Sequence, residues 1–331
     1  MSFSHVGVIG AGSWGTALSL LLLGNGLRVT MWAHDSAHVN HVNTRRENSV
    51  YLPGVRLPES MGLTAELGDL RDCDLLLVVT PSKAVREISA RLAASGVSKR
   101  AILLSCTKGV ERGSGKRMSE VIAEHFHDHA IAALSGPSHA EEVSRRMPTC
   151  VVLGCGDVEI ALRLQRAFTA PFFRSYTSDD VAGVELGGAL KNIFAIAAGA
   201  GDGLGLGDNA KAALVTRALV ELGRLGVALG GKRETFMGLS GVGDLMVTCF
   251  SRHSRNRAVG ERLGKGERLA DIVASMQMVA EGVPTAYSAF ECARRLGVET
   301  PIIDQVKAIL DGAISPADAM SRLLGRDPKP E

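Results

Sequence analysis

The apolar segment from Val181 to Gly201 contains only two charged residues, Glu185 and Lys191. A cation in so apolar a helix either extends its ammonium to solvent at an edge or holds it in a cleft, where it can act as a general acid or base. Both interpretations remain open from this segment alone. Gly187 lies four residues earlier on the same helical face, which predicts open space beside the ammonium for a small substrate.

A second lysine, Lys108, follows the apolar run Leu103–Cys106 after one intervening threonine. Ligands of open α/β folds bind at the carboxyl ends of the strands, so this lysine could contact a ligand. The commoner alternative is an ordinary loop lysine. Gly136 and Ser138 follow another apolar run in the same way, and small residues there could bring backbone N–H groups against a ligand. Taken alone, that stretch is a generic turn before a helix.

The triplet Ser254-Arg255-Asn256 opens a predicted helix, with Ser254 in a typical N-cap position. Donors at a helix N-terminus favour an anion, which predicts a phosphate clamp. A capped helix with a solvated arginine is the alternative. Asp244, which follows a glycine-rich turn, is interpreted either as a helix cap or as a partner in a proton network.

A glycine-rich turn connects the first apolar run, Val6–Ile9, to an apolar helical run. Gly10 permits a tight turn, Gly12 allows backbone to approach a pyrophosphate, and Gly15 allows the helix to pack closely on the strand. This strand–turn–helix–strand context is typical of dinucleotide binding. A glycine-rich turn without a ligand is the alternative.

The end of the second predicted strand bears on which dinucleotide is bound, because an acidic residue there usually contacts the ribose 2′-OH of NAD. The strand ends Trp32-Ala33-His34-Asp35, with no acid directly at its tip. We therefore expect NADP, with His34 near the 2′-phosphate. Binding of both NADP and NAD, with Asp35 as a partial ribose ligand, remains open. The alternative without a ligand is that His34, His38 and His41 simply line the exposed face of a short helix.

The segment His125-Phe126-His127-Asp128-His129 could converge on a metal only if it were extended. We expect no metal, because no Cys or acidic cluster stands nearby. The six cysteines contain no C-x-x-C pair, and most lie in apolar runs, which predicts free thiols in a reducing compartment. They are Cys73, Cys106, Cys150, Cys155, Cys249 and Cys292.

Apolar strand-like runs alternate with helical runs through the first half of the chain, which predicts a doubly wound parallel sheet. After the first two, the predicted strands are Leu75–Val79, Ala101–Leu104, Ile131–Leu134 and Cys150–Leu153, with helices between them such as Pro81–Ala94 and Gly113–Phe126. Beyond Asp179 only helical segments are predicted: Asp180–Ala200, Asn209–Leu229, Arg255–Leu263, Leu269–Met276, Thr285–Leu296, Pro301–Leu310 and Pro316–Leu323.

These patterns predict an α/β fold: an N-terminal Rossmann-type doubly wound sheet followed by an all-α C-terminal domain. We expect a dinucleotide-binding domain over residues 1–180, a helical substrate and catalytic domain over 181–325, and a flexible tail over 326–331. A length of 331 residues agrees with two domains.

The 37 basic and 35 acidic side chains leave a net charge of +2, so we expect neither nucleic acid nor a membrane surface as a partner. No apolar run approaches the roughly 20 residues needed to cross a bilayer. The N-terminus has no basic segment followed by an apolar one, as a secretory signal would have. We therefore expect a cytoplasmic protein.

Eight longer motifs combine these stretches: G-A-G-S-W-G-T-A-L from Gly10, Y-L-P-G from Tyr51, T-K-G-V from Thr107, S-G-P-S-H-A-E-E-V from Ser135, E-L-G-G-A-L-K-N-I-F-A-I-A-A-G from Glu185, G-D-L-M-V-T-C from Gly243, S-R-N from Ser254 and V-A-E-G-V-P-T-A from Val279. With them the chain resembles bacterial NAD(P)-dependent glycerol-3-phosphate dehydrogenases over nearly its whole length. His139 departs from the family pattern, since many relatives carry an aromatic residue there.

The resemblance implies reversible hydride transfer between NADP(H), or also NAD(H), and dihydroxyacetone phosphate. The product, sn-glycerol 3-phosphate, would feed glycerophospholipid synthesis, and the protein would be a homodimer. Catalytic positions carry over to Lys191, Lys108 and Asp244. Substrate positions carry over to Lys108, Gly136, Ser138, Lys191, Asp244, Ser254, Arg255 and Asn256. Cofactor positions are Gly10, Gly12, Ser13, Trp14, Gly15, His34, Tyr51, Lys108, Ala140, Arg255, Val279 and Glu281.

Two other functions are weighed against this one. The first is a related two-domain reductase of a keto or hydroxy acid, whose substrate would carry a carboxylate in place of the phosphate. The second is a non-catalytic protein that senses NADPH at the Rossmann site without turning it over. Such a sensor should lack a charged clamp on its helical domain.

Overall fold

The computed structural model describes residues 3–328, and these fall into two compact units. Unit 1 holds the residues up to Lys108 together with Lys116–Glu185, and unit 2 holds Gly109–Gly115 with the residues from Leu186 onward. The predicted boundary at 180/181 lies five residues before this division. Of the predicted tail 326–331, residues 329–331 lie outside the described part of the chain. Arg326 lies within it and forms an ion pair with Glu299.

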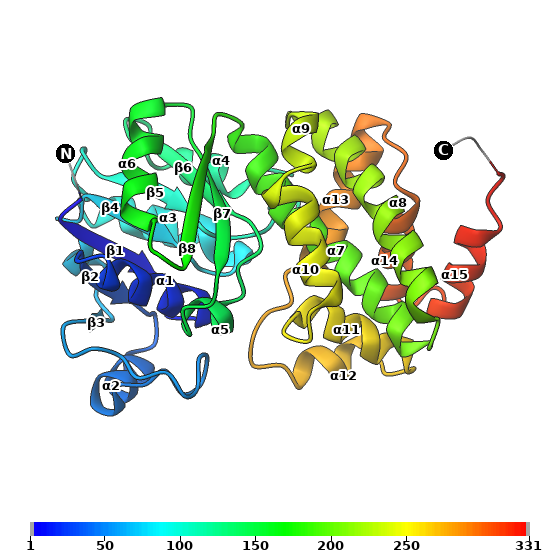
Figure 1. The fold of residues 1–331 in the computed structure, drawn as a ribbon, viewed down its shortest axis with the longest axis horizontal. Coiled ribbons are helices and arrows are strands. Elements are labelled where there is room, and N and C mark those ends of the chain that lie inside the picture. Colours follow the sequence, from blue (N-terminus) through cyan, green and yellow to red (C-terminus); the bar gives the residue numbers. More distant parts are fainter. Residues whose placement is uncertain (1–2, 329–331) are drawn as a thin grey trace. The chain divides into compact units, whose positions relative to one another are not determined.

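Unit 1 is built on an eight-stranded sheet in the order β3-β2-β1-β4-β5-β6-β7-β8 (Figure 1). The strands are β1 (His5–Ile9), β2 (Arg28–Trp32), β3 (Gly62–Thr64), β4 (Leu75–Val78), β5 (Ile102–Ser105), β6 (Ile131–Ser135), β7 (Thr149–Gly154) and β8 (Phe173–Ser178). All neighbouring pairs are parallel except β6 and β7. The doubly wound α/β class is thus confirmed.

The antiparallel β7 corrects the expectation of a fully parallel sheet. Only the one-turn helix α5 (Ala140–Val143) lies between β6 and β7. A parallel return normally needs a longer crossover that carries a full helix. Two strands were also not predicted: β3 has only three residues, and β8 alternates polar and apolar side chains at the sheet edge.

Helices cover both faces of the sheet. Alternate residues of each central strand belong to two separate apolar clusters, one containing Val8 and Leu77 and the other Leu76 and Leu103. The first cluster includes residues of α1 (Ser13–Gly24), α5 and α6 (Val158–Phe168), and the second includes residues of α3 (Val85–Ala94) and α4 (Met118–Ala123). The helix predicted from Gly113 begins only at Met118, since Gly113 and Gly115 take left-handed φ angles of +82° and +71°.

Unit 2 consists of helices: α7 (Val181–Gly203, which begins in unit 1), α8 (Gly207–Ala228), α9 (Arg233–Phe236), α10 (Asp244–Phe250), α11 (Arg255–Gly264), α12 (Leu269–Ala274), α13 (Gly282–Leu296), α14 (Pro301–Leu310) and α15 (Pro316–Leu324). This confirms the predicted helical character of the second half, although α9 and α10 were not predicted. Small residues let the helices approach closely. A Cβ added to Gly199 of α7 would lie 1.9 Å from the carbonyl oxygen of Arg257 in α11.

Two buried carboxylates fix helix ends within the units. In unit 1, Glu185 of α7 accepts hydrogen bonds from the Ser119 backbone N–H at 2.8 Å and from Arg117 at 2.7 Å. In unit 2, Glu221 of α8 accepts the first-turn N–H groups of α14, from Ile302 at 2.9 Å and Ile303 at 2.8 Å. Burial raises the pKa of Glu221 to about 7, outweighing these two bonds, which lower it.

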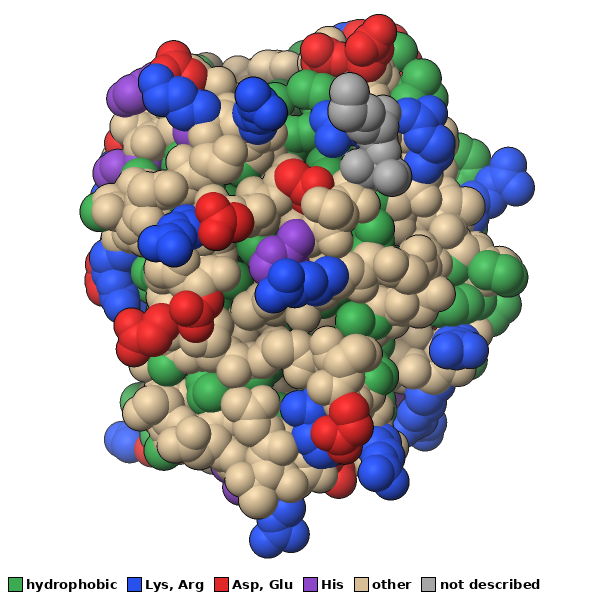
Figure 2. Space-filling view, turned by 90° about the vertical axis from the view of Figure 1, so that its left-hand side faces the viewer, with side chains coloured by type: hydrophobic (Ala, Val, Ile, Leu, Met, Phe, Trp, Pro, Cys, Tyr) green, Lys and Arg blue, Asp and Glu red, His purple; other side chains and the backbone are tan. Residues whose placement is uncertain are grey.

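Helix α7 corrects the expectation that no apolar segment is long enough to cross a bilayer. By length and composition alone its 23 residues would suffice, but 83% of its apolar 18-residue window is buried inside the protein. Such burial is typical of a core helix. On the face shown in Figure 2, Lys and Arg side chains are interspersed with Asp and Glu, so no extended field of one sign forms there.

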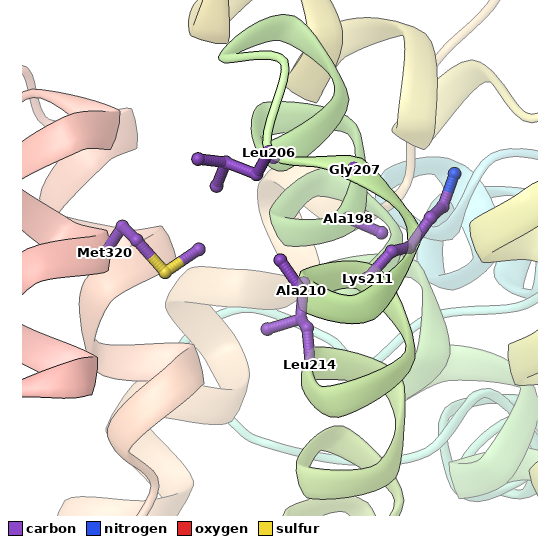
Figure 3. A pocket seen from close by; sticks show the side chains of 8 residues that line it. Ala198, Leu206, Gly207, Ala210, Lys211, Leu214 and Met320 are labelled. Atoms are coloured by element: carbon purple, nitrogen blue, oxygen red, sulfur yellow. The ribbon is translucent and has the colours of Figure 1, made fainter.

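A small gap lies between α7, α8 and α15 in unit 2. Figure 3 shows Met320 of α15 directed towards Ala210 of α8, while Lys211 points away from the gap. The cavity measures about 10 Å³, which is room for one water at most. It is a packing gap and offers no space for a ligand.

Candidate functional site

The glycines between β1 and α1 have distinct structural requirements. Gly10 takes a φ of +123°, and a Cβ there would lie 2.7 Å from the carbonyl oxygen of Val79. A Cβ on Gly15 would lie 1.9 Å from the Gly10 carbonyl oxygen, so this position must stay bare for the turn to close. A Cβ on Gly12 would meet nothing within 4 Å. Gly12 therefore faces open space, as approach of an anionic ligand requires.

Hydrogen-bond donors without a partner belong to residues near this turn in the chain or in the fold. No side chain caps the N-terminus of α1 at Gly12. The indole Nε1–H of Trp14 and the hydroxyl of Thr80 are buried and have no hydrogen-bond partner among the described residues. Buried donors are nearly always satisfied, so these groups fit the phosphates of a bound dinucleotide.

The residues after β2 are arranged as a capped helix. His34 and Asp35 are exposed, and the Asp35 carboxylate accepts the Ala37 N–H at 2.9 Å as the N-cap of α2 (Ser36–Arg45). His38 of α2 packs edge-on against Tyr51, with ring centroids 5.2 Å apart. Desolvation lowers the pKa of His38, which keeps that ring neutral near pH 7.

Three predicted substrate residues come together in unit 1. The Lys108 ammonium donates to the Gly136 carbonyl oxygen at 3.1 Å, and the Ser138 hydroxyl donates to the same oxygen at 2.9 Å. Gly136 takes a φ of +131°, and a Cβ there would lie 3.0 Å from the Val151 backbone. This backbone conformation turns the carbonyl towards the lysine. Ala140 follows as the first residue of α5 and is buried.

Lys191 lies in a buried polar cluster of unit 2. Its ammonium bonds to Asp244 Oδ1 and donates to the Thr248 hydroxyl at 2.6 Å. The side chains of Lys191 and Asp244 are only 7% and 1% exposed. Thr248 in turn donates to the Asp244 backbone carbonyl at 2.7 Å, so its hydroxyl lone pairs face the ammonium. The alternative that Lys191 extends its ammonium to solvent at the edge of the helix is therefore wrong.

The expectation of open space at Gly187 is also wrong. A Cβ at this position would lie 2.2 Å from the carbonyl oxygen of Ser240. Ser240 belongs to a π-helical turn, Leu239–Gly243, that directly precedes α10. Gly187 thus serves close packing of this turn on α7. That packing brings the first residue of α10, Asp244, to the lysine.

The predicted phosphate clamp begins α11. The Ser254 hydroxyl accepts the Arg257 N–H at 3.2 Å, which confirms the predicted N-cap. The exposed Arg255 guanidinium donates to the Val279 carbonyl oxygen at 3.1 Å. Asn256 is buried and accepts the Gly282 N–H at 2.8 Å, next to Glu281.

Three residues that sequence reasoning missed join these clusters. Thr248 lies four residues after Asp244 on the same helical face, a spacing that could have indicated it. Asn192 accepts from the Asn256 amide at 2.9 Å and so links the lysine-bearing helix to the start of α11. Thr80 carries the unsatisfied hydroxyl after β4, and no sequence signal distinguishes it from an ordinary loop residue.

The predicted residues thus form two sets within separate units. The fingerprint, His34, Tyr51, Lys108, Gly136, Ser138 and Ala140 lie in unit 1, and Lys191, Asp244, Ser254, Arg255, Asn256, Val279 and Glu281 lie in unit 2. Among residues 3–328 no group of three or more His, Cys, Asp or Glu side chains could hold a metal ion. All six cysteines are free, and burial raises the pKa of Cys249 beside the lysine cluster to about 12, so its thiol is neutral.

A Rossmann-type unit with open donors at its fingerprint, followed by a helical unit with a buried ammonium, defines a class: nucleotide-dependent oxidoreductases with a helical second domain. The models of the NAD-dependent glycerol-3-phosphate dehydrogenase N-terminus and C-terminus match residues 5–161 and 180–321. The chain belongs to this family, whose members are NAD(P)-dependent oxidoreductases acting on CH–OH donors. The resemblance inferred from the motifs is thereby confirmed.

Similar proteins share the full length of the chain. A glycerol-3-phosphate dehydrogenase [NAD(P)+] of Prosthecochloris aestuarii is 47% identical over 328 residues, 98% of each chain. One of Geobacillus thermodenitrificans is 47% identical over 331 residues, 99% of this chain and 96% of the other. The crystal structure of the glycerol-3-phosphate dehydrogenase of Coxiella burnetii superimposes with a TM-score of 0.94 at 38% identity, covering 98% of this chain and 99% of that one.

Proposed function

We propose that this protein interconverts dihydroxyacetone phosphate and sn-glycerol 3-phosphate with NADP(H), and also with NAD(H). The observation that carries the proposal is the buried cluster of Lys191, Asp244 and Thr248 within a family of dehydrogenases. A buried ammonium that touches a carboxylate and a hydroxyl can hand a proton to a substrate oxygen. A protein that only senses NADPH would have no use for such a group.

Several residues of unit 1 would hold the dinucleotide. Its phosphates would take the N–H groups at the start of α1, with Ser13 and the Trp14 indole as further donors. His34 and Tyr51 would serve its ribose end, and Lys108 and Ala140 are further proposed contacts in unit 1. The remaining proposed cofactor contacts, Arg255, Val279 and Glu281, belong to unit 2. When bound, the nicotinamide ring supplies a hydride to the carbonyl carbon or accepts one from the alcohol carbon.

Lys191 is proposed to be the general acid in reduction, donating a proton from Nζ to the developing alkoxide at the substrate's carbonyl oxygen. In the oxidation direction the same amine takes the hydroxyl proton. Asp244 and Thr248 orient the amine, since both contact it directly. Lys108, which follows β5 and whose ammonium donates to the Gly136 carbonyl oxygen, is proposed to supply positive charge to the substrate.

The substrate phosphate is proposed to bind at the start of α11. Ser254 caps this helix, and the Arg255 and Asn256 side chains add donors to the free N–H groups there. The Arg255 guanidinium is exposed, so an anion can reach it from solvent. In the alternative function, a keto-acid reductase, the carboxylate of the substrate would bind at this place instead of a phosphate.

Steady-state kinetics with dihydroxyacetone phosphate, run in parallel with NADPH and NADH, tests the proposal. We expect turnover with the phosphoester and a lower KM for NADPH than for NADH. Matched assays with ketopantoate and with unphosphorylated dihydroxyacetone are the controls, and both should react far more slowly. Faster reduction of the keto acid would overturn the substrate assignment, and cofactor binding without turnover of any carbonyl would favour a sensor.

The setting of the reaction is proposed as well. We infer a cytoplasmic homodimer that supplies sn-glycerol 3-phosphate for glycerophospholipid synthesis. The homodimer follows from the family resemblance, and unit 2 exposes large apolar side chains that a partner could cover, among them Met237, Met246 and Phe250. Light scattering after size exclusion should give twice the chain mass of 34.8 kDa. If the measured mass at micromolar protein concentration is that of one chain, the proposed homodimer is refuted.

A further inference from the structure

A hollow of about 380 Å³ opens in unit 1 away from the glycine fingerprint. Leu20 and Leu23 at the C-terminal end of α1 form one wall, and Val55 and Phe172 face them from two connecting segments. The fingerprint lies at the other end of α1, about 15 Å away along the helix at 1.5 Å per residue. The volume falls within the range of small-molecule sites, roughly 300–1,000 Å³.

Hydrogen bonds hold the walls of this hollow in place. The Arg46 guanidinium donates to the Met61 carbonyl oxygen at 3.1 Å and also to that of Pro58, which anchors the connecting segment that contains Val55. On the other side, the Asn25 amide at the end of α1 donates to the Ala167 carbonyl oxygen at 2.8 Å. The hollow is therefore formed before any ligand arrives, which lowers the entropic cost of binding.

Two exposed arginines give the hollow its positive charge. Arg56 and Arg146 both line it, and its lining includes no Asp or Glu. Among residues 3–328, neither guanidinium forms an ion pair, although the backbone of Arg56 forms an isolated β-bridge with that of Glu47. Arg146 takes a left-handed φ of +57°, which among the non-glycine residues of 3–328 is shared only by Arg46, and it ends the turn that follows α5. Two unpaired guanidinium groups beside apolar walls favour an anion that also has an apolar part.

We propose that this hollow binds a small organic anion with an apolar body. A phosphate or carboxylate head lies between Arg56 and Arg146, and the apolar body packs on Leu20, Leu23 and Phe172. The site is separate from the dinucleotide and substrate positions, none of which lines the hollow. Its ligand is distinct from dihydroxyacetone phosphate, which has no apolar body to place against the leucines.

Phenyl phosphate is a suitable probe, because it combines a dianionic head with a compact apolar ring. Binding would be measured by titration calorimetry on the full chain with saturating NADP+ and dihydroxyacetone phosphate present. These two ligands are both in the oxidised state, so they occupy the active site without reacting. We expect one saturable site per chain. Inorganic phosphate, which lacks the ring, and benzyl alcohol, which lacks the charge, should each bind at least tenfold more weakly.

Variants then locate the site. The double variant Arg56→Gln/Arg146→Gln should weaken phenyl phosphate binding at least tenfold, and Ser144→Trp, which places an indole in the hollow, should abolish it. Arg100→Gln, at an exposed position outside the hollow, is the matched control and should change the affinity less than twofold. All variants should keep NADPH-dependent turnover within twofold, which verifies folding independently.

Three outcomes would overturn the proposal. The first is no saturable binding of phenyl phosphate to the wild-type protein. The second is equal affinity in the wild type and the double variant. The third is inorganic phosphate that binds as tightly as phenyl phosphate, because the apolar walls would then contribute nothing.

Discussion

Replacing Lys191 by Met separates its proposed chemistry from its place in the core. The side chain is 7% exposed, and its partner Asp244 is 1% exposed. Removing the ammonium leaves the Asp244 carboxylate buried without a counter-charge, and breaking such a pair from one side costs about 3–5 kcal/mol. Loss of a general acid lowers turnover by about 10²–10⁴-fold. Lys191→Met should therefore lose both stability and activity. This variant alone does not show whether the activity falls because the proton donor is missing or because the fold is disturbed.

The double variant Lys191→Met/Asp244→Asn resolves the two effects. It removes both charges, and replacement of a buried ion pair by neutral side chains is often close to neutral in stability. We expect the free energy of unfolding of the double variant, measured with guanidinium, to regain most of the ~3–5 kcal/mol that Lys191→Met loses. NADPH oxidation by dihydroxyacetone phosphate should stay as slow as in the single variant. The affinity for NADPH, measured by fluorescence titration, should stay within a few-fold of wild type throughout.

Two results would refute this reasoning. If Lys191→Met retains near-normal kcat, the lysine is not the proton donor. If the double variant recovers activity together with stability, the loss in the single variant came from a disturbed fold and not from missing acid catalysis.

Further predictions concern four other positions. Burial raises the pKa of Glu221 from 4.5 to about 7, so the stability that its proton contributes is complete below pH 4.5 and is lost as the pH rises through 7. The free energy of unfolding, measured with guanidinium, should fall in the wild type by up to about 3 kcal/mol between pH 4.5 and 8 relative to Glu221→Gln, which cannot titrate. If the unfolding free energies of the two proteins change with pH in parallel, the raised pKa of Glu221 is contradicted. Arg255→Gln should raise the KM for dihydroxyacetone phosphate at least tenfold with a smaller effect on kcat, and an unchanged KM would remove the phosphate clamp. Gly12→Ala should fold normally, because its Cβ meets nothing within 4 Å, yet bind NADPH at least tenfold more weakly. Gly15→Ala should fail to fold, since its Cβ would lie 1.9 Å from a backbone oxygen, and thermal melting of the two variants compares them directly.

Much of the fold could be predicted from the sequence, because its signals are local. The glycine fingerprint is contiguous, and the two-domain pattern depends on apolar periodicity within single segments. Ser254 caps its helix through a bond to a residue three positions away, which the sequence predicts without knowledge of packing. The prediction failed where local signals are weak, as for the three-residue strand β3 and the half-polar edge strand β8.

The amino-acid sequence by itself determined that this protein combines a dinucleotide fingerprint with a helical region carrying one conspicuous lysine. Only the tertiary structure decided what surrounds that lysine. Lys191 and Asp244 are 53 residues apart along the chain, and they meet because a π-helical turn packs against Gly187. The sequence suggested open space at Gly187, whereas packing filled it with backbone. Spacing within one helix sets which residues share a face, but what covers that face depends on the path of the whole chain.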